Sequence, residues 1–378
     1  MHKPRPTAAA LAAHPAPSDD AAPRQATPDG TARYRARQAE RFARDFYRAG
    51  PLALTLSSIG IGTYLGDDTD DTDDAYAEAV RFAVGSGVNV VDSAINYRCQ
   101  RSERAIGRAL QGVLLAGDVR RDEVVVCTKG GYVPLDEYPP ATAEGYQGYL
   151  RREFYARNVM TAKDVVSGGH CLTPSFLQDC LARSRANLGL DVVDIYYVHN
   201  PEQQLAAVSY DELLDRLRAA FESLEESVER GEIGAYGCAT WQGLRVEPGA
   251  RGHIALADLV RLASEIAGDA HHFRMLQLPI NLAMPEAVRL PTQPLLGGKV
   301  VTILEAAREL GLSVAASATL MQSQLTANLP PAVRDLFPAL ATDAQRAVAF
   351  VRSLPGVTTA LVGMKQVAHV EENLGAGR

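Results

Sequence analysis

The sequence predicts an α/β protein in which eight parallel strands and their connecting helices close into one (β/α)8 barrel. Short apolar runs rich in β-branched residues alternate with longer segments of helical periodicity, a pattern typical of parallel sheets. Eight such units over about 320 residues match the size of a barrel. An open doubly wound sheet is the alternative, although no Gly-x-Gly-x-x-Gly motif follows an early strand. The predicted strands lie near Leu56, Val88, Asp122, Val193, Ile233, Met275, Leu312 and Thr358.

The segments between these strands carry apolar residues on one helical face. In the first of them, Ala75, Ala79 and Phe82 share a face, Asp73 or Asp74 can cap the N-terminus, and a glycine follows the last turn. The other segments repeat this pattern, so each strand is followed by a helix that returns the chain to the start of the next strand. The predicted helices span 73–87, 102–113, 174–190, 210–231, 255–268, 299–311 and 343–356.

Composition indicates a globular protein with a large core. The 378 residues are 47% hydrophobic and 22% charged, with a net charge of −7. This acidic balance gives no general attraction to nucleic acid or anionic membranes, and no apolar run of about 18 residues predicts a membrane span. The five cysteines have neither paired nor metal-type spacing, which predicts reduced thiols, a cytoplasmic location and no metal site.

The domain organisation follows from shifts in composition. Residues 1–31, rich in Ala, Pro and Asp, are predicted to be a disordered leader, with helical propensity from Ala32 toward Gly50. Residues 32–378 are predicted to form the barrel domain. Residues 130–173 interrupt its rhythm after the third strand with a segment rich in Tyr, Gly, Pro and Arg. A connection this long is usually functional or disordered, and its aromatic residues favour an ordered insertion at the rim.

Polar side chains stand where three neighbouring strands end. Asp92 ends the second strand, with Tyr97 in the following loop, Lys129 ends the third strand, and His199 ends the fourth. Because strand ends meet at one rim of a barrel, these four side chains are expected to converge. A lysine held by a carboxylate lowers the pKa of a nearby tyrosine, and a histidine can orient a carbonyl oxygen. The group suits proton donation during carbonyl reduction, with hydride supplied by a nicotinamide cofactor.

On these motifs the sequence resembles the aldo-keto reductase superfamily from about Leu52 to Leu374. The similar stretches include "VNVVDSAINY", "VVVCTKGG", "LGLDVVDIYYVHNP", "GEIGAYGCAT" and "LPGVTTALVG". The resemblance implies a (β/α)8 barrel that binds NADP(H), with NAD(H) possible, and a small-molecule carbonyl or alcohol substrate. It implies Tyr97 as general acid, Lys129 and Asp92 as the pair that tunes its pKa, and His199 as the orienting residue.

The resemblance also implies a cofactor site along the rim. Gly62, Thr63 and Tyr64 follow the first strand, and Gln277 on the sixth strand resembles the contact to the nicotinamide carboxamide. The adenosine half is expected at Gly363, Met364, Lys365, Glu372 and Asn373. Tyr64, Tyr132 and Trp241 are expected substrate contacts.

Several positions depart from the family pattern. Ala239 and Thr240 stand where the family usually has Ser-Asn, and Ser317 stands where a tyrosine usually stacks under the nicotinamide. The remaining hypotheses are therefore a lyase or isomerase on the same barrel, without redox chemistry, and a non-catalytic binding or regulatory member. The acidic run at 66–76 is expected to be a solvated loop with a helix cap, or else a surface that attracts cationic substrates.

Overall fold

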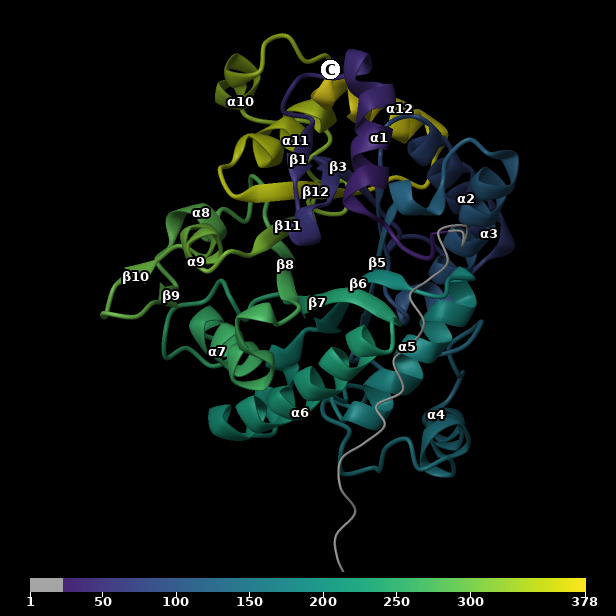
Figure 1. The fold of residues 1–378 in the computed structure, drawn as a ribbon, viewed down its shortest axis with the longest axis vertical. Coiled ribbons are helices and arrows are strands. Elements are labelled where there is room, and N and C mark those ends of the chain that lie inside the picture. Colours follow the sequence, from purple (N-terminus) through teal and green to yellow (C-terminus); the bar gives the residue numbers. More distant parts are fainter. Residues whose placement is uncertain (1–22) are drawn as a thin grey trace, which may run out of the picture.

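The barrel closes as the alternating pattern predicts. The computed structural model describes residues 23–378, and eight parallel strands form a closed barrel in the order β11-β12-β3-β4-β5-β6-β7-β8. Each of the eight predicted strand segments contributes one of these strands (Figure 1). The barrel strands are β3 (Ile59–Gly62), β4 (Val90–Asp92), β5 (Val125–Gly130), β6 (Val193–His199), β7 (Ile233–Ala239), β8 (Phe273–Pro279), β11 (Ser313–Ser317) and β12 (Val357–Gly363).

Helices surround the barrel and bury their apolar faces against the strands (Figure 1). Caps fix where several of them begin: Thr69 accepts a hydrogen bond from the backbone of Thr72, and Ser209 from that of Glu212. The helices are α2 (Asp70–Gly85), α3 (Arg101–Ala116), α5 (Pro174–Leu188), α6 (Tyr210–Glu229), α7 (Leu256–Ala267), α9 (Ile303–Glu309), α11 (Asp343–Ser353) and α12 (Val367–Leu374), with the short α8 (Glu286–Arg289) and α10 (Pro331–Leu336) in loops.

The N-terminal region closes the bottom of the barrel. Strand β1 (Tyr47–Ala49) pairs antiparallel with β2 (Thr55–Ser57), and Leu54 and Leu56 pack into the apolar barrel interior. The predicted leader is therefore too long at its end: helix α1 runs from Pro28 to Gln38, and the backbone N–H of Ala26 donates to Asp194 at 2.6 Å. Residues 1–22 of the predicted leader lie outside the described residues. The helix expected toward Gly50 ends at Gln38, because the chain turns to form β1.

The insertion after β5 is ordered and carries a small core of its own. It contains α4 (Ala143–Leu150), which continues into a π-helical turn over Arg151–Tyr155. Leu150, Phe154 and Met160 pack with Phe176 and Cys180 of α5. A hairpin of β9 (Gln293–Pro294) and β10 (Val300–Val301) extends the loop after β8. Within residues 23–378, no helix is long and apolar enough to cross a membrane, and no group of three or more metal-ligating side chains gathers.

Candidate active site

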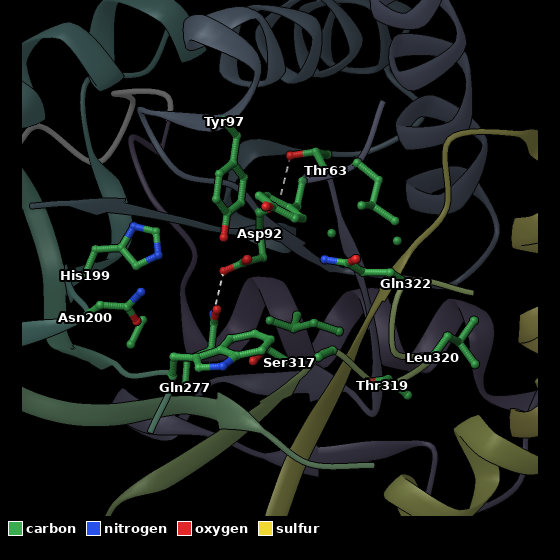
Figure 2. A pocket seen from close by; sticks show the side chains of 18 of the residues that line it. Thr63, Asp92, Tyr97, His199, Asn200, Gln277, Ser317, Thr319, Leu320 and Gln322 are labelled. Atoms are coloured by element: carbon green, nitrogen blue, oxygen red, sulfur yellow. Dashed lines mark hydrogen bonds between the residues drawn. The ribbon is translucent and has the colours of Figure 1, made fainter. Parts of the chain in front are cut away.

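A cavity of about 450 Å³ opens at the carboxyl ends of the barrel strands. Its size falls in the range of small-molecule sites. Figure 2 shows Tyr97 and His199 beside one another on one wall, Asp92 and Gln277 at the base, and Gln322 across the cavity. Residues of six strand-end loops line it, which is how the barrel brings distant parts of the sequence to one place.

A buried ion pair forms the base of the site. Lys129 is fully buried, and its ammonium donates to Asp92 Oδ2 at 2.6 Å and to the carbonyl oxygen of Ser93 at 2.6 Å. The other oxygen of Asp92 accepts from Gln277 Nε2 at 2.8 Å. The carboxylate at the end of β4 is therefore held from the neighbouring strand β5 and from β8, which lies across the barrel from β4.

Tyr97 lies above this pair, with its ring centroid 4.9 Å from Lys129 Nζ. Burial raises the pKa of the Tyr97 phenol above its usual value, and the Lys129 ammonium partly offsets this. The Lys129 ammonium lowers the pKa of Tyr97, as expected from the sequence, but burial raises this pKa by more, so the net shift is upward. Burial alone would lower the pKa of Lys129, but Asp92 and Tyr97 together raise it. Both groups consequently hold their protons at neutral pH.

A left-handed turn fixes the loop that follows Tyr97. Arg98, Cys99 and Gln100 have φ of 48°, 52° and 69°, a conformation that non-glycine residues adopt rarely and at an energetic cost. Arg98 holds the turn by donating to the carbonyl oxygen of Asp67 at 2.8 Å and to Asp73 Oδ1 at 2.5 Å. The strained turn thus starts directly beside the tyrosine that the sequence predicts as general acid.

Aspartates of the acidic run at 66–76 form ion pairs with arginines in and after this turn. Asp73 forms ion pairs with both Arg98 and Arg101, and Arg101 also pairs with Asp70. Thr69 is the N-cap of α2, in agreement with the prediction that the run contains a helix cap. Arginines pair with three of the six aspartates of the run, Asp70, Asp73 and Asp74, so the alternative that the run attracts cationic substrates stays a prediction.

His199 is buried at the end of β6 between two aromatic rings. Its ring centroid lies 6.0 Å from that of Tyr97 and 5.0 Å from that of Tyr132. Burial and the nearby Lys129 charge hold the pKa of His199 well below its usual value, so its imidazole is neutral. Its Nδ1 atom is buried without a partner in the described structure.

The cavity brings together most of the predicted cofactor and substrate residues. Lys129 lies beneath it, and Met364 packs into the hydrophobic core. Lys365 and Glu372 are half-buried, Asn373 is buried, and none of the three lines the cavity. The predicted residues that line the cavity are Gly62, Thr63, Tyr64, Asp92, Tyr97, Tyr132, His199, Thr240, Trp241, Gln277, Ser317 and Gly363.

Sequence reasoning missed several lining residues. Asn200 follows His199 directly, and its amide donates to the Tyr132 hydroxyl at 3.0 Å. Thr319, Leu320, Gln322 and Ser323 come from the loop after β11, where no motif marks them. Three consecutive residues of that loop, 321–323, have left-handed φ, a feature that appears only in the folded chain. Asn96, Leu65, Ala318 and Leu361 complete the missed set.

One orphaned atom lies in the cavity wall that follows β7. The Thr240 hydroxyl is buried without a hydrogen-bond partner, although its backbone N–H donates to Gln277 at 2.8 Å. Trp241 follows it with 49% of its surface exposed. Buried polar atoms are normally satisfied, so an unpaired hydroxyl lining a cavity indicates a place for a polar ligand group.

The fold and this cavity define a (β/α)8-barrel protein whose site is built from strand-end residues. A model of the aldo/keto reductase family matches residues 58–247, half of the chain. The protein belongs to the aldo/keto reductase family, which confirms the resemblance seen in the sequence.

Individual relatives are more distant. The chain is 29% identical over 192 residues to a D-threo-aldose 1-dehydrogenase of Pseudomonas sp. and 28% identical over 159 residues to an NADH-specific methylglyoxal reductase of Escherichia coli K12. The first match spans 49% of each chain, and the second spans 40% of each. The chain thus covers about half or less of the length of these curated relatives.

Solved structures share the fold over most of the chain. An aldo/keto reductase of Klebsiella pneumoniae, crystallised with NADP and acetate, is 19% identical, with a TM-score of 0.57 over 88% of this chain and 89% of that one. The holo form of an aldo-keto reductase of Bacillus halodurans is 16% identical, with a TM-score of 0.56 over 87% and 90%. These similarities support the barrel fold.

Proposed function

We propose that the protein is a nicotinamide-dependent oxidoreductase that reduces an aldehyde or ketone, or oxidises the corresponding alcohol. The convergence of Tyr97, Lys129, Asp92 and His199 at one cavity supports this most strongly. Membership of the aldo/keto reductase family agrees with it.

Each of the four side chains has a distinct part in the proposed reaction. The Tyr97 phenol is protonated at neutral pH, so it can donate its proton to a carbonyl oxygen that gains charge. The Lys129 ammonium, 4.9 Å from the ring, stabilises the phenolate that remains. Asp92 holds that ammonium in place.

His199 contributes as a neutral group. Because its pKa is low, it adds no charge to the site, and its ring lies against Tyr97. A neutral imidazole can donate a hydrogen bond to the carbonyl oxygen and orient it toward the tyrosine. In the reverse direction the same residues take the proton from an alcohol.

The cavity fits the nicotinamide end of a dinucleotide. The unpaired Thr240 hydroxyl and the Gln277 amide are polar groups that can bind a carboxamide, and Ser317 leaves room beside them. Gly363 lines the cavity and Asn373 Oδ1 is buried without a partner, which agrees with the proposal that both contact the adenosine half. When bound, the cofactor supplies the hydride. NADP(H) is proposed because a Klebsiella relative was crystallised with it and Lys365 can pair with a phosphate.

Cofactor binding tests this proposal. Purified protein is titrated with NADPH and with NADH, and the change in cofactor fluorescence is followed. Tighter binding of NADPH is expected. Binding of NADH alone would correct the cofactor preference. If neither binds at high micromolar concentration, the redox function is wrong, and chemistry without a nicotinamide or a non-catalytic role takes its place.

A further inference from the structure

A buried histidine of the rim insertion contacts the backbone of the active site. His170, near the end of the insertion, has only 1% of its surface exposed, and its Nε2 lies 2.7 Å from the carbonyl oxygen of His199. A carbonyl oxygen can only accept, so Nε2 carries the proton and donates. The bond therefore joins the insertion to the backbone of a residue in the proposed catalytic group.

A hydrogen-bond chain fixes this protonation state of His170. An arginine can only donate, so Gln204 presents its oxygen to the Arg216 guanidinium. The amide nitrogen of Gln204 then faces His170 Nδ1 at 2.7 Å and donates to it. Nδ1 is thereby an acceptor, and the single imidazole proton stays on Nε2, directed at His199.

Electrostatics agree with this assignment. Burial lowers the pKa of His170 to about 4, partly opposed by its bond to the His199 carbonyl group. A second proton on Nδ1 would face the Gln204 amide, which is itself a donor. His170 is therefore neutral at assay pH and acts through the direction of its hydrogen bond.

The backbone is arranged to make this contact. Asn200 has φ of 46°, so the chain turns sharply after His199, whose carbonyl group points to the insertion. Gly131 crosses so closely that a Cβ there would lie 2.8 Å from the His199 oxygen and 3.2 Å from His170 Nε2. The two ends of the insertion pair beside it through a bridge between Tyr132 and His170, and a second bridge joins His170 to Val166.

Tyr132 of the insertion contacts the side chain of His199 as well. Its ring packs edge-on against His170 at 4.9 Å and against His199 at 5.0 Å. The insertion thus contacts His199 at two places, its carbonyl group and its ring.

We propose that His170 is a positioning residue, through which the insertion at 130–173 holds His199 in the geometry that the reaction requires. This inference rests on the proposed function. It makes the insertion a component of the active site and not only a cover for it.

Two substitutions separate the contacts of His170. His170→Gln places an amide N–H near the position of Nε2 and keeps the bond to His199, whereas His170→Asn is shorter, keeps an acceptor for Gln204 and loses that bond. We expect His170→Asn to lower kcat about ten- to hundredfold, with cofactor affinity within twofold, because small misplacements in an active site cost this much. His170→Gln should restore most of the lost activity.

His253 offers a matched control. Its Nε2 also bonds a backbone carbonyl group, that of Thr292 at 2.8 Å, but it does not line the cavity. His253→Asn should leave kcat unchanged. If His170→Asn does not fold, Gln204→Leu removes the bond that orients His170 and should lower kcat in the same direction.

A double-mutant cycle distinguishes positioning from general support of the fold. In a His199→Ala background, His170→Asn should have little further effect on kcat. An equal loss in both backgrounds, or wild-type kcat in His170→Asn, would overturn the proposal.

A second measurement does not need turnover. The imidazole ¹⁵N signals of His199, assigned by their loss in His199→Ala, should shift in His170→Asn and not in His170→Gln. Unchanged signals would overturn the positioning role. If the wild type binds no cofactor, the proposed function fails, while this measurement still decides whether His170 holds His199.

Discussion

The two sides of the cavity are built differently. On the side of β4, β5 and β6, Asp92 and Lys129 are buried and joined to each other, to Gln277 and to Ser93. On the side of β7 and β11, the Thr240 hydroxyl has no partner and Trp241 is half exposed. The ion pair of the first side is satisfied without a ligand, although His199 Nδ1 on that side is buried without a partner, and the second side has polar groups that a ligand would satisfy. Proton transfer thus depends on preformed geometry, and cofactor binding on groups that are still open.

The largest expected difference between the two sides is at Tyr97. Replacing Tyr97 with Phe removes the proton donor and leaves the ring and the opposite wall in place. Turnover should fall on the order of 10²- to 10⁴-fold, the usual contribution of a general acid. Fluorescence titration should show cofactor affinity nearly unchanged. Full activity in Tyr97→Phe would refute the acid assignment.

The ion pair tests how far the first side depends on buried charge. Lys129→Met leaves the Asp92 carboxylate buried without its cation, which should destabilise the protein by about 3–5 kcal/mol. Urea unfolding measures this loss. Adding Asp92→Asn to Lys129→Met should recover part of the stability but none of the activity. Wild-type stability in the single variant would contradict a tightly buried pair.

Stability should also fall in acid because His170 is buried as a neutral group. Its pKa is about 4 in the folded protein, below the ordinary value of about 6.5 expected on unfolding. Between these values the unfolded chain binds more protons, so the unfolding free energy falls as pH drops from about 6.5 to 4, on the order of 3 kcal/mol. Urea unfolding across this range should show a shallower slope for His170→Gln. An identical slope would mean that another group causes the loss.

A substitution on the side of β7 and β11 should have the smallest effect on turnover. Trp241→Ala removes an exposed aromatic surface from the cavity, which should cost about 0.5–1.5 kcal/mol of binding. KM or cofactor Kd should therefore rise roughly two- to tenfold, with little change in kcat. A large fall in kcat would place Trp241 with the proton-transfer group and remove the distinction between the two sides.

Much of the fold was predictable from the chain because it depends on local periodicity. The apolar runs placed all eight barrel strands, and three strand ends with one adjacent loop revealed Asp92, Lys129, His199 and Tyr97. Strand β2 was not predicted as a separate strand. In the sequence it forms one apolar run with β3, and its pairing with β1 distinguishes the two.

The sequence by itself determined which residues end the parallel strands, because strand ends of a barrel meet at one rim whatever the loops do. Tertiary structure alone decided the sign of the Tyr97 pKa shift, the left-handed turn at 98–100 and the contact of His170 with His199. Each of these depends on burial or on atoms brought together from distant positions. His170 and Gln204 are separated by 34 residues, and no local pattern records that they meet.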